Sequence, residues 1–402
     1  MNRVVISGIG VVSPVGASLD EFWTALVEGR SGIGPLTIIP TERLSTRIAA
    51  QVGGFDPDAH FSPKQAHLLD RFAQFAVVAA RAAVRDAQCE ISEELALDAA
   101  TVVGNGSGGQ GTVDAGYLKL YGQNAEKAHP LSIPRWMVNA AASQVSIDLG
   151  LRGPTWTVAT ACASATHAIG QAFHMVRNGQ APIALAGGTE ACLTVGTVKA
   201  WEALRALSTD TCRPFSRNRS GLVIGEGAAM FLLEPRDRAL ARGARVYAEV
   251  LGFGMSADAS DITAADADGG ARAMRAALRD ARANPEDVDY VNAHGTGTIL
   301  NDRTESEALR KVFGSHADRL AVSSSKAVLG HSMGAAGALE LAAAALALQT
   351  QTIPPTANFE EPDPACDIDC VPNVARSARV RMAMSNSFAF GGLNAVIALG
   401  RA

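Results

Sequence analysis

Short apolar runs that end in glycine or another small residue recur along the whole chain, and most precede a helix-forming segment. They include residues 4–6, 99–103, 183–186, 246–250, 288–293 and 321–325. Strands and helices in alternation predict layered α/β packing. The second half of the chain repeats the order of elements seen in the first. We therefore expect an N-terminal half over residues 1–245 and a C-terminal half over residues 246–402.

The segment Val158–Gly170 places a cysteine at one of these strand-to-helix joins. Cys162 has the small neighbours Ala161 and Ala163 and is followed by a helix-forming run. A thiol at a helix N-terminus faces free backbone N–H groups and the positive end of the helix dipole, and both favour the thiolate. A buried, unreactive cysteine is the alternative, because a nucleophilic cysteine needs a base or a cationic partner from elsewhere in the chain.

Charge and cysteine usage exclude several classes of function. The formal net charge is −5, which leaves no basic excess for nucleic acid or an anionic membrane. Six cysteines are scattered through the chain, and the one close pair, Cys366 and Cys370, lacks companion ligands for a metal. The N-terminal residues lack the apolar core of a signal peptide, and no apolar segment of about twenty residues is free of charge. We expect a cytoplasmic protein with no transmembrane span, metal or cofactor.

Two glycine-rich loops depart from nucleotide-binding motifs. Gly8-Ile9-Gly10 is followed by Pro14 and a late Gly16, whereas a dinucleotide fingerprint needs its third glycine earlier. The loop Gly104–Gly109 lacks the Lys-Ser/Thr of a phosphate-binding loop. Glycine is equally suited to close packing beside a narrow channel.

Three later strand ends carry groups that could act on Cys162. His294 ends one strand, Lys326 ends the next with His331 close behind it, and Phe390 follows a strand near the C-terminus. Catalytic groups gather at the carboxyl ends of strands in α/β sheets, although a single histidine there is often only a loop residue. Taken together, these positions indicate one reactive cluster.

Four sequence blocks around these residues resemble the signature motifs of β-ketoacyl-acyl-carrier-protein synthases, the elongating condensing enzymes of type II fatty-acid synthesis. The blocks are Thr160–Ser164, Asn292–Thr298, Ser325–Gly337 and Asn386–Gly392. The resemblance covers essentially the whole chain. It implies a thiolase-type α/β fold of five layers, α-β-α-β-α, built from two similar halves and paired as a homodimer. It also implies an acyl carrier protein as partner, bearing acyl and malonyl groups on phosphopantetheine.

The same resemblance implies catalytic roles for residues of this chain. Cys162 takes the acyl group, and the backbone N–H groups of Cys162 and Phe390 form an oxyanion hole. His294 and His331 stabilise the enolate that forms when the malonyl group loses carbon dioxide. The resulting carbanion attacks the acyl-Cys162 thioester and yields a β-ketoacyl product, in fatty-acid or more specialised acyl-chain or polyketide synthesis.

Supporting roles follow from the resemblance as well. Lys326 and Glu340 are expected to form a charge pair that orients His331, with Glu340 on the helix that His331 opens. Thr296 and Thr298 are placed to hydrogen-bond the amides of phosphopantetheine. A local turn bond is the alternative role for both threonines.

Residues near the expected acyl pocket depart from the family pattern. Ala389 replaces a glycine beside Phe390, the gate to the pocket in such enzymes, and should stiffen that loop. Ser107 stands where a bulky aliphatic residue is common and would leave more room in the channel. Trp201 would narrow it instead, and Phe388 is expected to contact the substrate.

The acidic carrier protein needs a basic surface on its partner. Lys64, Arg71 and Arg205 are candidates for docking it by charge complementarity. His67 and Leu68 stand where the family often has basic residues, so the patch is thin. Ordinary solvated charges are the alternative for the three candidates.

Two other functions remain open from the sequence. A non-catalytic chain-length-factor-like subunit of a ketosynthase heterodimer would have the same fold, but such subunits lack the active cysteine that Cys162 supplies. A thiolase or other coenzyme A acyltransferase would need a second catalytic cysteine near the C-terminus. Cys366 and Cys370 lie in a loop rich in Pro and Asp, which is a poor place for one.

Overall fold

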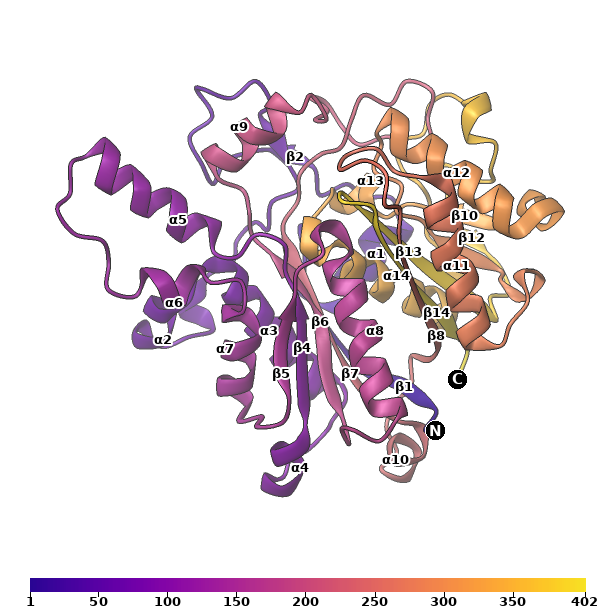
Figure 1. Cartoon of the computed structure of the whole chain (residues 1–402), viewed down its shortest axis with the longest axis horizontal. Coiled ribbons are helices and arrows are strands. Elements are labelled where there is room, and N and C mark those ends of the chain that lie inside the picture. The colour runs from indigo at the N-terminus through magenta and orange to yellow at the C-terminus, as the bar shows by residue number, and fades with distance from the viewer.

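A computed structural model describes all 402 residues, and its centre is a single sheet of ten strands in the order β10-β9-β13-β14-β8-β1-β7-β6-β4-β5 (Figure 1). The N-terminal half supplies β1 (Val4–Val12), β4 (Ala100–Gly104), β5 (Thr155–Val158), β6 (Ala184–Glu190) and β7 (Gly227–Pro235). The C-terminal half supplies β8 (Ala248–Ala257), β9 (Tyr290–Asn292), β10 (Ala321–Ser323), β13 (Met382–Ala389) and β14 (Leu393–Gly400).

The two halves of the sheet have the same connectivity. In the N-terminal half, β4 is parallel to β5 and β6, while β6, β7 and β1 are antiparallel neighbours. In the C-terminal half, β9 is parallel to β10 and β13, while β13, β14 and β8 are antiparallel neighbours. The halves join where Val4–Ile6 of β1 pairs with β8. The expectation of two similar halves is confirmed.

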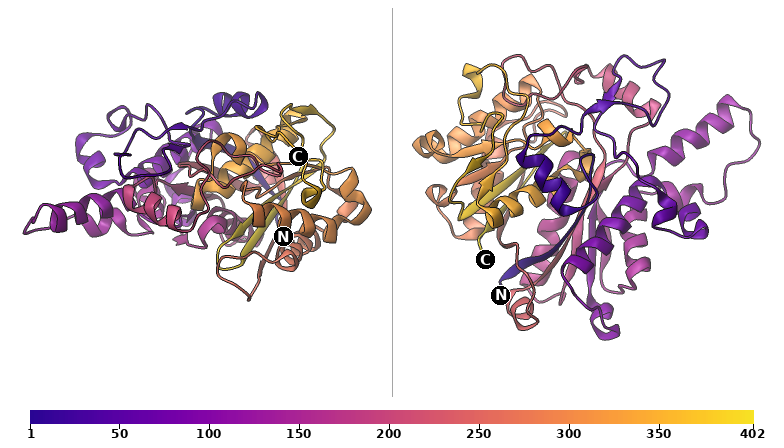
Figure 2. Two further views of the ribbon diagram at one scale, coloured as in Figure 1. Left: turned by 90° about the horizontal axis from the view of Figure 1, so that it is seen from above. Right: turned by 180° about the vertical axis from the view of Figure 1, so that it is seen from behind.

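Helices form three layers around these strands. The longer ones are α1 (Leu19–Val27), α3 (Arg71–Asp86), α7 (Ala140–Leu149), α8 (Ser164–Arg177), α9 (Val195–Ala203), α11 (Ala267–Ala281), α12 (Ile299–Phe313) and α14 (Ala336–Thr350). Helices α3 and α7 cover the outer face of the N-terminal strands, and α11, backed by α12, covers that of the C-terminal strands. Helices α8 and α14 pack on each other and on strands of both halves. The molecule therefore has the expected α-β-α-β-α layers (Figure 2).

Helix α14 is buried on all sides because it lies in the central layer. Its residues from Ala336 to Leu348 are all buried, and alanine predominates among them. Small side chains let neighbouring helices and strands approach closely. By length and composition the span Met333–Thr350 could cross a membrane, with a mean hydropathy of 1.3, but 89% of it is buried inside the protein. It is therefore a core helix.

Local sequence signals predict some helix boundaries correctly, and other boundaries differ in the structure. Ser18 caps α1 in a reciprocal capping box, as its position predicts. Residues 53–70 contain Pro57 and Pro63, which are typical of a loop, yet they include the short helix α2 (Pro63–Leu68). The helix predicted to open at His331 begins only at Ala336, after a 3₁₀ turn, because Met333 adopts a left-handed backbone conformation.

Residues 110–136 project from the body of the molecule as an arm (Figures 1 and 2). The arm contains α5 (Gln110–Tyr117), a π-helical turn (Leu118–Gly122) and α6 (Ser132–Trp136). The remaining elements are short. They are α4 (Glu93–Asp98), α10 (Arg236–Ala241), α13 (Lys326–Leu329) and the strand pairs β2 (Gly34–Pro35) with β3 (Ile48–Ala49) and β11 (Thr352–Ile353) with β12 (Arg376–Ser377).

Candidate active site

Cys162 lies on a tight turn between β5 and α8, where the sequence places it. Its turn is one 3₁₀ segment, Ala161–Ala163, and Ala161 has a left-handed φ of 49°. Ser164 holds this turn, since its hydroxyl donates to the Ala161 carbonyl at 2.6 Å and accepts from the Thr160 N–H at 2.9 Å. Left-handed backbone is costly for a residue with a Cβ and recurs at functional sites, where the surroundings enforce it.

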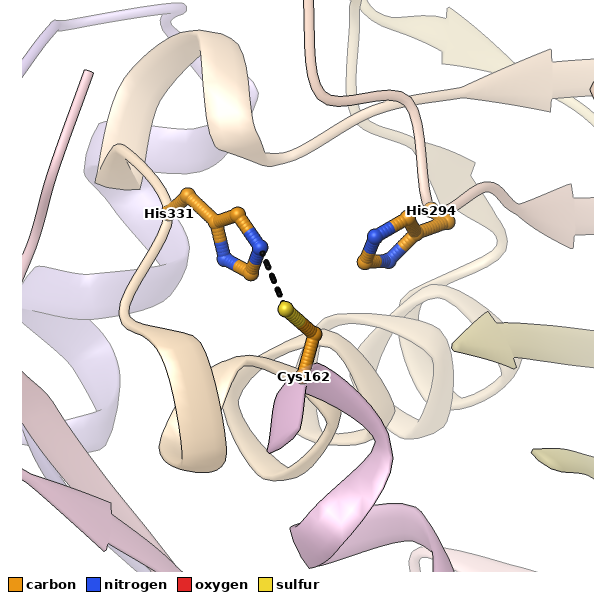
Figure 3. A group of neighbouring side chains, drawn as sticks. All are labelled: Cys162, His294 and His331. Carbon is orange, nitrogen blue, oxygen red and sulfur yellow. Dashed lines mark hydrogen bonds between the residues drawn. The ribbon is translucent and has the colours of Figure 1, made fainter. Parts of the chain in front are cut away.

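Two histidines from the C-terminal half face the thiol (Figure 3). His331 Nε2 lies 3.2 Å from Cys162 Sγ. His294 follows β9 and lies across from His331, with the ring centroids 5.4 Å apart and the rings nearly perpendicular. All three side chains are buried. The fold thus brings Cys162 together with His294, 132 positions further along the chain, and with His331, 169 positions further along.

Both imidazoles are neutral and present an N–H group to the cavity. Burial and the adjacent Lys326 ammonium hold the pKa of His294 and of His331 well below the usual range. The Met333 backbone N–H donates to His331 Nδ1 at 3.2 Å, and Lys326 Nζ lies 3.3 Å from His294 Nδ1. Since both Nδ1 atoms accept, the protons reside on the Nε2 atoms, which face the thiol.

The Lys326–Glu340 ion pair forms as expected but acts on the other histidine. Lys326 Nζ pairs with the Glu340 carboxylate and donates to the His294 carbonyl at 2.6 Å. His331 instead receives its hydrogen bond from the Met333 backbone. The prediction that the pair orients His331 is therefore wrong. The cause is that Lys326 opens α13, whereas His331 lies beyond the turn at Gly330.

The protonation state predicted for Cys162 is also corrected. Burial raises the pKa of the Cys162 thiol to about 11, while the Lys326 charge and the Phe390 backbone N–H lower it less. Burial therefore outweighs the helix N-terminus, and the resting cysteine is a thiol. The Phe390 N–H does lie where it can stabilise negative charge at Sγ, which fits its expected place in an oxyanion hole.

A mainly apolar cavity of about 380 Å³ opens above these groups. Its walls include most of the predicted substrate-binding residues and the predicted docking residue Arg205, namely Cys162, Trp201, Arg205, His294, Thr296, Thr298, His331, Phe388 and Phe390. Trp201 stacks on Phe390 with the centroids 5.7 Å apart and the planes inclined by 24°. The hydroxyls of Thr296 and Thr298 are 2.9 Å apart. Both threonines therefore line the cavity, as the phosphopantetheine role requires, and their hydroxyls also make a local hydrogen bond to each other.

Two predicted site residues lie elsewhere. Ser107 does not line the cavity, because its loop wraps around the buried Glu190 carboxylate. Arg71 is held in a bidentate ion pair with Glu226, at 2.7 and 3.0 Å, and is not free to dock a partner. Lys64 is exposed on α2, as docking requires.

Two buried carboxylates beside the site carry no recognisable sequence motif. Glu190 accepts the backbone N–H groups of Gly106 and Gly334, and Glu305 accepts those of His294 and Gly295. Burial raises the pKa of each to about 7, against the effect of these donors. Both tie catalytic loops to the sheet and helices. Only tertiary contacts identify them, because an isolated Glu in a strand or helix is ordinarily solvent-facing.

The same cluster has the atom types of a metal site, with ligand atoms of Cys162, His294 and His331 within 4.8 Å of one another. However, the Nε2 atoms that would bind a metal carry the protons, and the Lys326 ammonium lies close by. A divalent cation would be repelled by that charge. The arrangement is suited to donating hydrogen bonds.

Cys366 and Cys370 do not approach this site. Both are buried among the core residues under α11 and α12, and neither lines the cavity that contains Cys162. A thiolase needs a second cysteine at the reacting thioester. The arrangement here does not provide one.

The fold has five layers and two similar halves, and its cavity holds a thiol on a tight turn beside two neutral imidazoles. This combination defines a condensing enzyme. The sequence matches the family description "Beta-ketoacyl synthase, N-terminal domain" over residues 1–239 and "Beta-ketoacyl synthase, C-terminal domain" over residues 247–360. The chain belongs to the β-ketoacyl synthase family.

Relatives that match along nearly the full length include a nodulation protein and a 3-oxoacyl-[acyl-carrier-protein] synthase. The chain is 47% identical to Nodulation protein E of Rhizobium sp. (strain N33), over 98% of each chain. It is 42% identical to 3-oxoacyl-[acyl-carrier-protein] synthase 2 of Staphylococcus aureus (strain COL), over 98% of this chain and 97% of that protein. A solved structure described as a type II PKS acyl-carrier protein in complex with its ketosynthase bound to the hexaketide matches with a TM-score of 0.89. It is 32% identical and covers 100% of this chain and 99% of that one.

Proposed function

We propose that this condensing enzyme elongates an acyl chain held on Cys162, using malonyl-acyl carrier protein as the carbon donor. The observation that supports this most directly is the 3.2 Å approach of His331 Nε2 to Cys162 Sγ in a cavity that also receives His294. These groups meet the needs of two successive steps, acyl transfer and decarboxylative condensation.

In the first step, Cys162 Sγ attacks the carbonyl carbon of the acyl thioester. The tetrahedral oxyanion is stabilised by the backbone N–H groups of Cys162 and Phe390. Collapse breaks the bond to the carrier thiol, which leaves with the proton from Cys162. Because the thiol pKa is about 11, we expect this proton to move during attack and not before it.

In the second step, the malonyl thioester enters and its carbonyl oxygen accepts hydrogen bonds from the Nε2–H groups of His294 and His331. Loss of carbon dioxide leaves an electron pair on the α-carbon, delocalised as an enolate that these two donors stabilise. The carbanion attacks the acyl-Cys162 carbonyl and expels Cys162 as a thiolate, which regains a proton. The thioester carbonyl keeps two donors throughout, so the site favours the charged enolate over the neutral substrate.

The test is the intact mass of the protein after mixing with a panel of acyl-carrier proteins of different chain length. We expect an acyl adduct on the wild type and none on Cys162→Ala, and we expect malonyl-carrier protein to discharge the adduct. The preferred chain length is the one that acylates fastest. No adduct with any chain would contradict the proposal and favour a non-catalytic partner subunit.

We also propose that the carrier protein docks across α2 and the arm. Besides Lys64 on α2, the groove between α2 and α5 is lined by Arg71, Lys119, Lys127 and Arg135 and by the imidazole of His129. Arg205 adds a charge at the cavity mouth. Carrier proteins of this kind are acidic, and complementary charge speeds association. Arg71 also lines this groove, but Glu226 neutralises its charge, so docking depends on the other basic side chains.

Charge reversal tests the docking surface. The double variant Lys64→Glu/Lys127→Glu should lower kcat/KM for an acyl-carrier protein at least tenfold and leave it unchanged for the acyl-pantetheine thioester, which has no protein part. Lys311→Glu, a reversal of an exposed charge far from the groove, is the control. Equal losses with both substrates would contradict docking at this surface.

A homodimer through the β5 edge is the proposed assembly. The carbonyls of Pro154 and Val158 accept the N–H groups of Thr101 in β4 and of Asn105 just after it, so alternation turns the peptide groups of Thr155 and Thr157 away from the sheet. The opposite edge is closed, since the Val322 N–H of β10 donates to the Asp369 carbonyl. An unpaired edge strand readily pairs with a second copy of itself.

The arm supports the same assembly. It lies on the β5 side of the molecule (Figure 1) and exposes the large apolar side chains Tyr117, Leu118, Tyr121 and Ile133. Tyr121 is 78% exposed in the single chain. Exposed apolar groups gathered beside an open strand edge are typical of a protein interface.

A further inference from the structure

One buried cation near the cavity has no part in the chemistry described so far. Arg219 lies in the segment that connects α9 to β7, and its side chain is only 2% exposed. Its guanidinium donates from Nη1 to the Ser216 carbonyl at 2.9 Å and to the Asp363 carboxylate at 2.5 Å. Burying a charge requires such partners. The Ser216 carbonyl and the Asp363 carboxylate both bind Nη1 of the guanidinium.

The Nε–Nη2 edge of the guanidinium binds the end of the loop that carries Thr296 and Thr298. Arg219 Nε donates to the Thr298 carbonyl at 3.1 Å, and Nη2 donates to the Ile299 carbonyl at 3.1 Å. Two consecutive carbonyls are thus held by one planar fork, which fixes the direction of the intervening peptide. A lysine could not reproduce this, because its ammonium is a single point donor.

The loop needs such support because its own backbone gives little. Gly295 and Gly297 both have positive φ, at 33° and 77°, and regular helix starts only after Thr298. Glu305 and Ser324 hold the start of the loop, through the His294 and Gly295 N–H groups and the Gly295 carbonyl. The buried Asp302 carboxylate accepts the Gly297 N–H at 3.2 Å and lies 3.7 Å from Arg219, and the Gly221 N–H donates to the Gly297 carbonyl at 3.1 Å. Arg219 acts at the end of the loop, where Thr298 stands.

We propose that Arg219 is a positioning residue that sets the hydroxyls of Thr296 and Thr298 for the amides of the phosphopantetheine arm. This inference rests on the proposed function. Arg219 touches no substrate atom. It acts through the backbone of the loop, so its loss should weaken recognition of the amide-bearing arm while leaving thiol attack on the thioester intact. Small displacements of a positioning group have large effects on rate.

The test compares two acyl donors with the same octanoyl chain. Octanoyl-pantetheine carries the amides, whereas the octanoyl thioester of ethanethiol carries none. The measured quantity is the ratio of their second-order rate constants for acylation of Cys162, followed by intact mass. For Arg219→Lys we expect this ratio to fall about tenfold, the effect of weakening one or two hydrogen bonds. The rate with the ethanethiol thioester should stay within about twofold of the wild-type value.

Matched variants separate positioning from general structure. Arg213→Lys changes an arginine of the same segment whose ion pairs go to Asp210 and Glu360 and not to the loop, so its ratio should equal that of the wild type. Thr296→Val should lower the ratio as Arg219→Lys does, and the double variant should fall no further. If Arg219→Lys does not fold, Asp363→Asn loosens the same guanidinium from its partly exposed side and should lower the ratio in the same direction.

Three results would overturn the inference: an unchanged ratio in the Arg219 and Asp363 variants, equal losses with both donors, or additive losses in the double variant. Failure of the wild type to accept either acyl group is a separate result. It would count against the proposed function itself.

Discussion

Opposing effects act on the protonation of the Cys162 thiol. Burial favours the neutral thiol, while the Lys326 charge and the Phe390 N–H favour the thiolate, and burial dominates. The neighbouring histidines cannot store the proton, because burial and Lys326 keep the pKa of both well below the usual range. In the proposed function, Cys162 therefore becomes reactive only when a thioester is bound, which would limit side reactions of a free thiolate.

This balance predicts the pH dependence of alkylation by iodoacetamide. Below a pKa of about 11 the thiolate fraction rises about tenfold per pH unit, so the alkylation rate of Cys162 should climb steadily from about pH 5.5 to 9.5. No inflection near pH 6.5 is expected, since His331 stays neutral. Intact mass against time measures the rate, with Cys162→Ala as the control for the other five cysteines. A plateau below pH 8 would show that the thiolate is the resting form.

The two central helices, α8 and α14, begin in the same way. Helix α8 is preceded by a 3₁₀ turn at Ala161–Ala163, and α14 by one at Met333–Ala335. Each turn opens with a left-handed residue, at φ 49° for Ala161 and 46° for Met333. The N-terminal turn carries Cys162. The C-terminal turn carries Gly334 in the equivalent place, and its backbone N–H groups serve His331 and Glu190.

The close contact between α8 and α14 predicts that replacing Gly337 by alanine destabilises the protein. A Cβ on Gly337 in α14 would lie 2.0 Å from Thr166 Oγ1 in α8 and would disturb its 2.7 Å hydrogen bond to Ser387. We expect Gly337→Ala to lower the free energy of unfolding by about 1–3 kcal/mol, as overpacked cores do. Chemical denaturation measures it.

Gly116 in α5 gives the matched control. A Cβ there meets nothing within 4 Å, so Gly116→Ala should be neutral or stabilise by up to about 1 kcal/mol through helix propensity. The same stability change in both variants would mean that the helices do not approach as closely as the structure has them.

At the scale of the whole molecule, the two ends of the sheet differ. The β10 edge is covered by the chain around Asp369, and the β5 edge is open beside a groove of about 420 Å³ lined by residues of α7 and β5. A sheet of this length with one open edge invites association. Pairing of two β5 strands would extend the sheet through a two-fold axis, which is the commonest symmetry of homo-oligomers.

Thr157→Pro tests this assembly. Proline removes only the outward-facing N–H of Thr157, and an edge strand tolerates proline on its solvent side. We expect the wild type to sediment as a dimer and the variant to shift towards monomer, with its fold retained by circular dichroism. Thr157→Val keeps the N–H and should remain dimeric. A wild type that sediments as a monomer, or a Thr157→Pro dimer as tight as the wild type, would contradict pairing at this edge.

Much of this architecture follows from local sequence. The apolar runs, their glycine ends and the helix-forming segments between them predict the alternating layers and the turn that bears Cys162. The resemblance of four motif blocks to β-ketoacyl synthases singles out His294 and His331 as partners of the thiol. Helix boundaries are less well determined. Nothing in the residues after His331 reveals that Met333 adopts a left-handed turn and delays α14 to Ala336.

The sequence by itself determined the fold class and, through the resemblance of its motifs to β-ketoacyl synthases, the cysteine and two histidines that the structure brings together, because these depend on short-range patterns of residue type. Tertiary structure alone decided which histidine Lys326 contacts, why Arg71 is occupied by Glu226, and that the thiol is protonated at rest. Each of these depends on burial and on partners distant in sequence. Desolvation and hydrogen bonding act through space, and a linear order of residues does not specify them until the chain has packed.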